Sequence, residues 1–107
     1  MGDTPYKEPR GIDKYMEQKI TVNLAGNFAT LTLNEEKTLI FSKEPTVEDL
    51  LNHLNDLYHT TVFSKKSLQE HRISIMYNGQ RLDSKAIKKV KLNSADIITI
   101  VQPMVGG

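Results

Sequence analysis

The sequence predicts an α+β roll, in which a mixed β-sheet packs on one main helix. Three features indicate this fold class: a single long amphipathic helix near the middle of the chain, strand-like alternation on both sides of it, and an almost wholly apolar run close to the last residues. With 107 residues, 38% of them hydrophobic, the chain is long enough for one modest core and too short for two. We therefore expect one ordered domain, over residues 19–103.

Several strands are predicted before the helix. Apolar and polar residues alternate over residues 19–24, which is typical of a half-buried strand. Residues 25–27 (Ala-Gly-Asn) are expected to break it. Residues 28–33 are again apolar and β-branched, and the pattern leaves open whether they form a hairpin arm or an irregular segment. Residues 34–37 are interpreted as a polar turn, followed by another short strand at residues 38–42.

The helix is predicted to follow Thr46, because a threonine with an acidic residue three positions later is typical of a helix N-cap. Apolar residues then recur at spacings of three and four, opposite polar ones, and form one continuous stripe. One face of the helix is therefore expected to be buried against the sheet. The stripe consists of Val47, Leu50, Leu51, Leu54, Leu57 and Tyr58.

The segments after the helix predict a second group of strands. Residues 64–71 are polar and fit either a loop or a short helix starting near Ser67. Residues 73–77 alternate between apolar and polar, and Asn78-Gly79 is the strongest hairpin turn signal in the chain. The return strand is expected to start at Arg81-Leu82.

The last strand is predicted to lie at the centre of the sheet. A basic connector over residues 84–92 leads to a turn at residues 93–96, and its Ile87, Val90 and Leu92 are expected to tuck under the sheet. Residues 97–101 (IITIV) are almost all apolar, which is typical of a central strand. Pro103 has no backbone N–H, so the sheet should end there.

Composition excludes several classes of function. The 14 Lys and Arg residues nearly balance the 13 Asp and Glu residues, so a basic field over the whole chain is absent and nucleic acid is not the expected partner. The absence of cysteine excludes disulfides, thiolate metal sites and a thiol nucleophile. No apolar run is long enough to span a membrane, and the first ten residues lack a signal-peptide core. A cytoplasmic protein without a membrane partner is expected, with a flexible N-terminal arm over residues 1–18.

No motif for hydrolase, zinc-protease or phosphate-loop chemistry occurs, and we expect neither an enzyme active site nor a metal site. His53, His59 and His71 lack the spacing that would place two imidazoles on one helical face. Residues 64–92 are rich in cations, which fits an acidic partner, an RNA-contacting patch, or lysines that only keep an edge strand from aggregating. The last of these three interpretations is preferred, and RNA is the least expected partner, because no aromatic residues lie between the lysines.

The last residues carry the candidate reactive group. A carboxylate on Gly107, preceded by Gly106, would sit on a thin stalk able to enter a narrow cleft, because neither residue has a Cβ atom. Pro103 would stiffen the base of the stalk, and Met104 and Val105 would supply apolar contacts. The alternative is a frayed terminus in which the two glycines have no role.

Three segments resemble the ThiS/MoaD sulfur-carrier family: the final run LNSADIITIVQPMVGG from residue 92, the helix entered through EPTVEDLLNHL, and the strand–turn–strand IMYNGQRL at residues 75–82. They occur in the order found in that family and cover residues 19–107. The family's tail is of the type P-P-x-x-G-G, whereas this chain has Gln102 before a single Pro103, and only Asp96 matches the family's acidic turn. The chain is also similar to ubiquitin-related and small archaeal modifiers.

The resemblance implies a ubiquitin-like β-grasp roll and a non-catalytic protein that holds no cofactor of its own. A ubiquitin-activating-like partner would use ATP to adenylate the Gly107 carboxylate, and sulfur transfer would give a thiocarboxylate. The acceptor would be the molybdopterin synthase large subunit, as for molybdopterin synthase small subunits, or another sulfur acceptor in thiamin or tRNA pathways. Two alternatives stay open: conjugation to lysines, as in ubiquitin-like modifiers, and a β-grasp interaction module whose tail is never activated.

The last strand is also expected to contribute to a partner surface. Ile97, Thr99 and Val101 share one face of this strand, while Ile98 and Ile100 share the other. Because the helix covers only one face, the residues of the opposite face are expected to be available for docking. We therefore predict that Ile97, Val101 and the tail residues from Pro103 onwards contact the partner.

Overall fold

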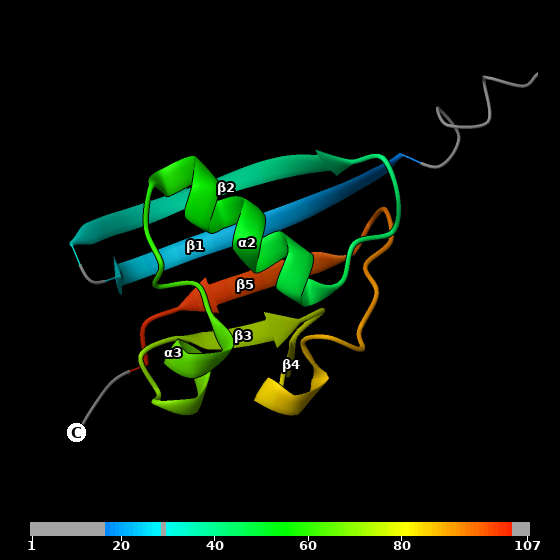
Figure 1. The fold of residues 1–107 in the computed structure, drawn as a ribbon. Helices are drawn as coiled ribbons and strands as arrows, with labels where there is room; N and C mark the ends of the chain where they lie inside the picture. The colour runs from blue at the N-terminus through cyan, green and yellow to red at the C-terminus, as the bar shows by residue number, and fades with distance from the viewer. Residues whose placement is uncertain (1–16, 29, 104–107) are drawn as a thin grey trace, which may run out of the picture.

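The computed structural model describes residues 17–28 and 30–103 and confirms the predicted roll (Figure 1). One five-stranded mixed sheet has the strand order β2-β1-β5-β3-β4, and helix α2 crosses one of its faces. Along the chain the elements are β1 (Gln18–Phe28), β2 (Leu31–Phe41), α2 (Val47–Tyr58), α3 (Lys65–Gln69), β3 (Ser74–Tyr77), β4 (Gln80–Arg81), the 3-10 helix η1 (Ser84–Ala86) and β5 (Ile97–Val101).

Helix α2 begins and ends as its sequence predicts. The Asp49 backbone N–H donates to Thr46 Oγ1 at 3.1 Å, and the Thr46 N–H donates to the Asp49 carboxylate at 2.9 Å, which completes a capping box. His59 ends the helix in the left-handed conformation at φ 54°. The apolar stripe faces the sheet, since Val47, Leu50, Leu51 and Leu54 are buried, although Leu57 stays 44% exposed.

The predicted break at residues 25–27 is wrong, because β1 continues through them to Phe28 and pairs antiparallel with β2 along its full length. Gly26 and Asn27 stay in register opposite Leu33 and Thr32. The strand continues because Gly26 adopts a positive φ of 141°, which a residue without Cβ tolerates, while its neighbours keep their pairing. Residues 28–33, whose role the sequence left open, form the end of this hairpin.

The predicted turn at residues 34–37 is also wrong, because these residues lie inside β2, and residues 38–41 are its continuation. β2 is the edge strand of the sheet, so polar side chains along it remain in contact with water. Glu35 has partners on the helix side: its carboxylate accepts from the Tyr58 hydroxyl at 2.7 Å and lies 3.6 Å from Lys37 Nζ. A half-buried edge explains the polar run that suggested a turn.

The second half of the chain follows the prediction closely. The short helix α3 begins at Lys65, two residues before the predicted start, because the Ser64 side chain caps it. Asn78 and Gly79 have positive φ values of 49° and 88° and form the turn between β3 and β4. In the connector, Ile87 and Leu92 are buried, and Val90 packs against the core.

Strand β5 lies at the centre of the sheet, as predicted, between β1, with which it is parallel, and β3, with which it is antiparallel. It ends at Val101, before Pro103. β1 begins at Gln18, one residue inside the predicted arm. The expected flexibility of residues 1–16 falls outside the described residues.

Candidate functional site

The predicted site residues lie along β5 and beyond its end. Ile97, Val101 and Pro103 belong to the described residues, whereas Met104, Val105, Gly106 and Gly107 follow directly after them and lie outside. The described part of the site is therefore the face of β5 and the two residues from which the tail starts. The proposed functional roles of all these residues stay predictions.

The two faces of β5 differ as predicted. Ile98 and Ile100 are fully buried beneath α2, whereas Ile97 is 43% exposed and Thr99 and Val101 are half-buried on the opposite face. Register places Thr21 beside Ile97, and Ser74, which is buried, beside Val101. The most exposed apolar side chain of β5 on this face is therefore that of Ile97.

Gln102, the first residue after β5, is held to β1 by two hydrogen bonds. Its backbone N–H donates to the Ala25 carbonyl at 3.3 Å, and its side-chain oxygen accepts from the Asn27 N–H at 3.0 Å. Gly26 lies between these two partners, and a Cβ atom built on it would lie 2.7 Å from Gln102 Cβ. We call Gly26, Asn27 and Gln102 the tail latch.

Sequence reasoning missed the tail latch. Residues 25–27 were interpreted as a break, and Gln102 as a substitute for a proline. The only local signal was a small, flexible residue inside a strand pattern, which often marks a close approach by another backbone. The approaching residue is more than seventy positions away in the sequence, so local patterns do not reveal it.

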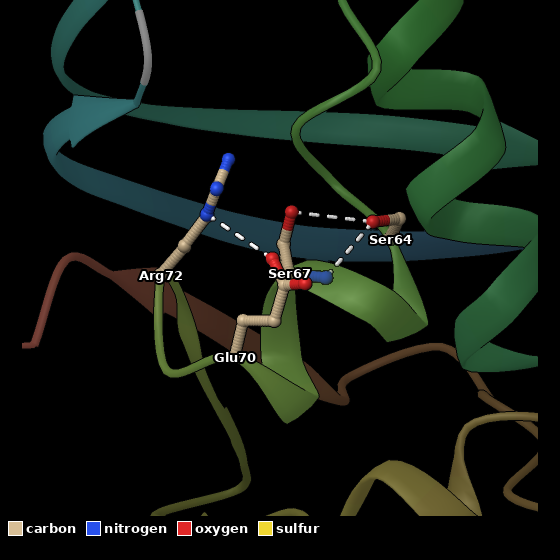
Figure 2. A network of polar contacts seen from close by, with 4 residues as sticks. All are labelled: Ser64, Ser67, Glu70 and Arg72. Atoms are coloured by element: carbon tan, nitrogen blue, oxygen red, sulfur yellow. Dashed lines mark hydrogen bonds and ion pairs between the residues drawn. The ribbon is translucent and has the colours of Figure 1, made fainter.

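A cavity of about 290 Å³ lies beside the base of the tail. On one side it is bounded by Asn27, Gln102 and Pro103, and on the other by Val62, Glu70, His71 and Arg72. Arg72 Nε lies 3.2 Å from a Glu70 carboxylate oxygen, and the Ser67 N–H donates to Ser64 Oγ at the start of α3 (Figure 2). The rim of this cavity therefore carries both an acidic and a basic group.

The opposite end of β5 is held by a denser polar network. The Asp96 carboxylate accepts from the Asn93 N–H at 2.8 Å, from Asn78 Nδ2 at 3.0 Å and from the Tyr77 hydroxyl at 3.2 Å. The Asn78 side-chain oxygen in turn accepts from the Ile97 N–H at 2.7 Å. Burial, together with the nearby Asp96 carboxylate, raises the pKa of the Tyr77 hydroxyl above its ordinary value.

The residues considered for metal or catalytic chemistry do not converge. Among residues 17–28 and 30–103, no group of three His, Asp or Glu side chains is arranged to hold a metal ion. His53 packs edge-on against Phe41, with ring centroids 5.4 Å apart, and His59 caps α2. No helix in this described part of the chain is long and apolar enough to cross a membrane.

The cations of the second half belong to α3, β4, η1 and the segments that follow α3 and η1, and β4 is the edge strand opposite to β2 (Figure 1). Within the described residues, Arg72 is the only one of them with an ion pair closer than 4.0 Å. The cluster contains Lys65, Lys66, Arg72, Arg81, Lys85, Lys88, Lys89 and Lys91. Its interpretation as a partner surface or as a solvated edge stays a prediction.

Solved structures with the same fold include small proteins of archaea and bacteria. Subunit 1 of a molybdopterin converting factor from Pyrococcus furiosus is 15% identical, with a TM-score of 0.57 over 81% of this chain and 99% of that one. Small archaeal modifier protein 1 from Methanosarcina acetivorans is 21% identical, with a TM-score of 0.54 over 85% and 98%. A chain in the complex of molybdopterin-converting factor subunits 1 and 2 from Helicobacter pylori is 20% identical, with a TM-score of 0.51 over 83% and 99%.

These neighbours, with the strand order and the single main helix, define a ubiquitin-like β-grasp protein. More narrowly, the chain belongs to the ThiS family, whose model matches residues 22–107. No curated protein matches the sequence. The members of the ThiS family are small sulfur carriers rather than catalysts.

Proposed function

We propose that this protein is a sulfur carrier and that the Gly107 carboxylate is the group on which sulfur is loaded. The observation that supports this most directly is the extent of the family match, which runs through the whole last strand and on to Gly107 itself. The protein would act as the substrate of a partner enzyme and would bind no cofactor of its own.

The chemistry requires an activation step, because a carboxylate is a poor acceptor for nucleophiles. The adenylating partner joins the Gly107 carboxylate to the α-phosphate of ATP, which gives an acyl-adenylate and releases pyrophosphate. Hydrosulfide, HS⁻, then attacks the carbonyl carbon. The bond between that carbon and the phosphate oxygen breaks, AMP leaves, and a thiocarboxylate remains.

The position of β5 suits a carrier of this kind. Strand β5 is paired on both sides and ends at Val101, so the tail starts from a fixed point of the sheet. Four residues follow Pro103, and when fully extended they span at most about 14 Å. This length would bring the terminal carboxylate into a partner's nucleotide site while the domain stays at its entrance.

The similar structures suggest the class of acceptor. The Helicobacter pylori neighbour was solved in a complex of two subunits of molybdopterin-converting factor. We therefore propose a molybdopterin synthase small-subunit role, in which the thiocarboxylate donates its sulfur through a large subunit, and we place the protein in the cytoplasm, where ATP is available. Conjugation to lysines is the second candidate, and it is favoured by the likeness to small archaeal modifier protein 1.

ATP–pyrophosphate exchange tests the activation step. The purified cognate adenylating enzyme is assayed with the full chain, with a chain that lacks Gly107, and with Gly107→Ala. We expect exchange with the full chain only, because shortening withdraws the carboxylate and a Cβ atom crowds the narrow cleft. Asn52→Ala, which changes an exposed residue of α2, is the control and should exchange normally. Exchange that persists without Gly107 would contradict the proposal.

A further inference from the structure

The tail latch is a built contact at the point where the last strand ends. The ladder between β1 and β5 ends with Ala25 opposite Val101, yet Gln102 continues the connection through its backbone N–H and its side-chain oxygen. The side-chain oxygen takes the place that the next strand carbonyl would occupy. One residue outside the strand is thereby held to β1 by two hydrogen bonds.

Gly26 makes this contact possible. Its backbone lies so close to Gln102 that an added Cβ atom would lie 2.7 Å from Gln102 Cβ and 3.0 Å from the Gln102 backbone nitrogen. Any other residue at position 26 would push the two segments apart, and its φ of 141° also disfavours other residues. The conformation of β1 at this point is therefore matched to the presence of Gln102.

The latch is also connected to the edge strand. The Thr32 hydroxyl of β2 donates to Asn27 Oδ1 at 2.8 Å, while the Asn27 backbone N–H donates to Gln102. Polar contacts thus run from β2 through β1 to the residue before Pro103. Because Pro103 has a fixed φ, holding Gln102 also restricts the direction in which the chain continues.

We propose that Gln102 is a positioning residue for the reaction of the tail: through Gly26 and Asn27 it fixes the direction in which residues 104–107 leave the domain, so that the partner enzyme meets a pre-oriented tail. This inference rests on the proposed function for its catalytic consequence, and on the described contacts alone for its structural one. Gln102 does not touch the reacting carboxylate.

The expected consequence follows from pre-organisation. A tail whose base is fixed samples fewer directions, so less conformational entropy is lost when it enters the cleft. Releasing Gln102 lowers the fraction of molecules that present the tail correctly, and the apparent affinity for the partner falls by that fraction. Once the tail is seated, the carboxylate reacts as before. The change should therefore raise KM for the carrier and leave kcat unchanged.

The test uses the full chain and three variants. Gln102→Ala removes the acceptor oxygen, whereas Gln102→Glu keeps an oxygen that can accept from the Asn27 N–H. Ser94→Ala is the matched control, because Ser94 Oγ accepts from the Lys19 N–H, also at 3.0 Å, and so joins β1 to the turn before β5 in the same way. The control removes a similar hydrogen bond near the start of β5, which is the side of the strand from which no tail leaves.

Two measurements are made on each variant. By ¹⁵N relaxation, Gln102→Ala should increase the fast motion of residues 104–107, while Gln102→Glu and Ser94→Ala leave it as in the parent chain. In the adenylation assay, Gln102→Ala should raise KM about two- to tenfold, the range expected for the loss of one hydrogen bond, at unchanged kcat. Gln102→Glu should restore the parent KM.

The outcomes separate the two proposals. If the parent chain supports no exchange, or if exchange continues without Gly107, the proposed function fails, and the relaxation data still decide the latch. If the parent chain is active but Gln102→Ala matches it in tail motion and in KM, the positioning role is overturned. It is equally overturned if Ser94→Ala produces the same changes, because the effect would then reflect general loosening of β5.

Discussion

The two ends of β5 are held to the rest of the domain in different ways. At its start, Asp96 accepts three hydrogen bonds, and the Asn78 side chain accepts from the first residue of the strand. These bonds join β5 to β3, to the turn after β3 and to the turn at residues 93–96. At its end, Gln102 makes two hydrogen bonds to β1 alone. The contacts at the start of β5 hold several segments of the fold in place, whereas the proposed role of Gln102 at its end is to direct the segment that follows. Stability and function are therefore expected to respond to different residues of one strand.

The largest effect on stability is expected from Asp96→Ala. The change removes the acceptor of three hydrogen bonds and leaves the Tyr77 hydroxyl and the Asn78 amide without this partner. We expect the free energy of unfolding to fall by about 2–3 kcal/mol, measured by urea denaturation. Asp83→Ala is the control, since that exposed carboxylate bonds only within its own turn. Equal losses in the two variants would show that the network at the start of β5 has no special role.

A smaller loss is expected from Gly26→Ala at the other end. The new Cβ atom meets Gln102, and the positive φ is strained for alanine. We expect about 1–2 kcal/mol of destabilisation in thermal or urea unfolding, together with increased motion of the tail. Gly79→Ala separates the two causes, because Gly79 has a positive φ of 88° but nothing within 4 Å of an added Cβ. If both variants lost the same stability and neither changed the motion of the tail, the close approach of Gly26 to Gln102 would have no effect on stability or on the tail.

The smallest effect concerns the pH dependence of stability at the start of β5. Burial and the Asp96 carboxylate raise the pKa of Tyr77, so the folded state favours the neutral phenol. This contribution is fully present below the ordinary tyrosine pKa of about 10 and is lost as pH rises through the higher folded value.

Asp96→Asn should lower the Tyr77 pKa toward its ordinary value, as followed by near-ultraviolet absorbance in a pH titration. Tyr58, whose pKa is raised by burial and by Glu35, is the internal control and should titrate unchanged. An unaltered Tyr77 transition in Asp96→Asn would show that the carboxylate does not act on this hydroxyl.

Local signals predicted the elements that depend on local chemistry. Thr46 and Asp49 cap α2 across three residues, Asn78-Gly79 supplies the positive φ values of its turn, and the apolar run in β5 indicates its central place. Each of these features is set by neighbours in the sequence, so the pattern was sufficient to find them.

The long hairpin and the tail latch depend on residues far apart in the chain. Glu35 was interpreted as part of a turn because its partner Tyr58 lies on the helix, 23 residues away. Gly26 was interpreted as a strand breaker because the residue that it accommodates, Gln102, approaches only in the folded sheet. Tertiary contacts therefore determine the conformation of both segments. This holds in particular for the tail latch, which forms the base of the candidate site.

The central claim, that sulfur is loaded on the Gly107 carboxylate, is tested most directly by intact mass. The full chain is incubated with its adenylating enzyme, ATP and sulfide, and fragmentation then locates any change along the chain. The account predicts a mass gain equal to the difference between sulfur and oxygen, confined to Gly107 and absent without ATP. An unchanged mass under conditions of active pyrophosphate exchange, or a gain located elsewhere in the chain, would contradict it.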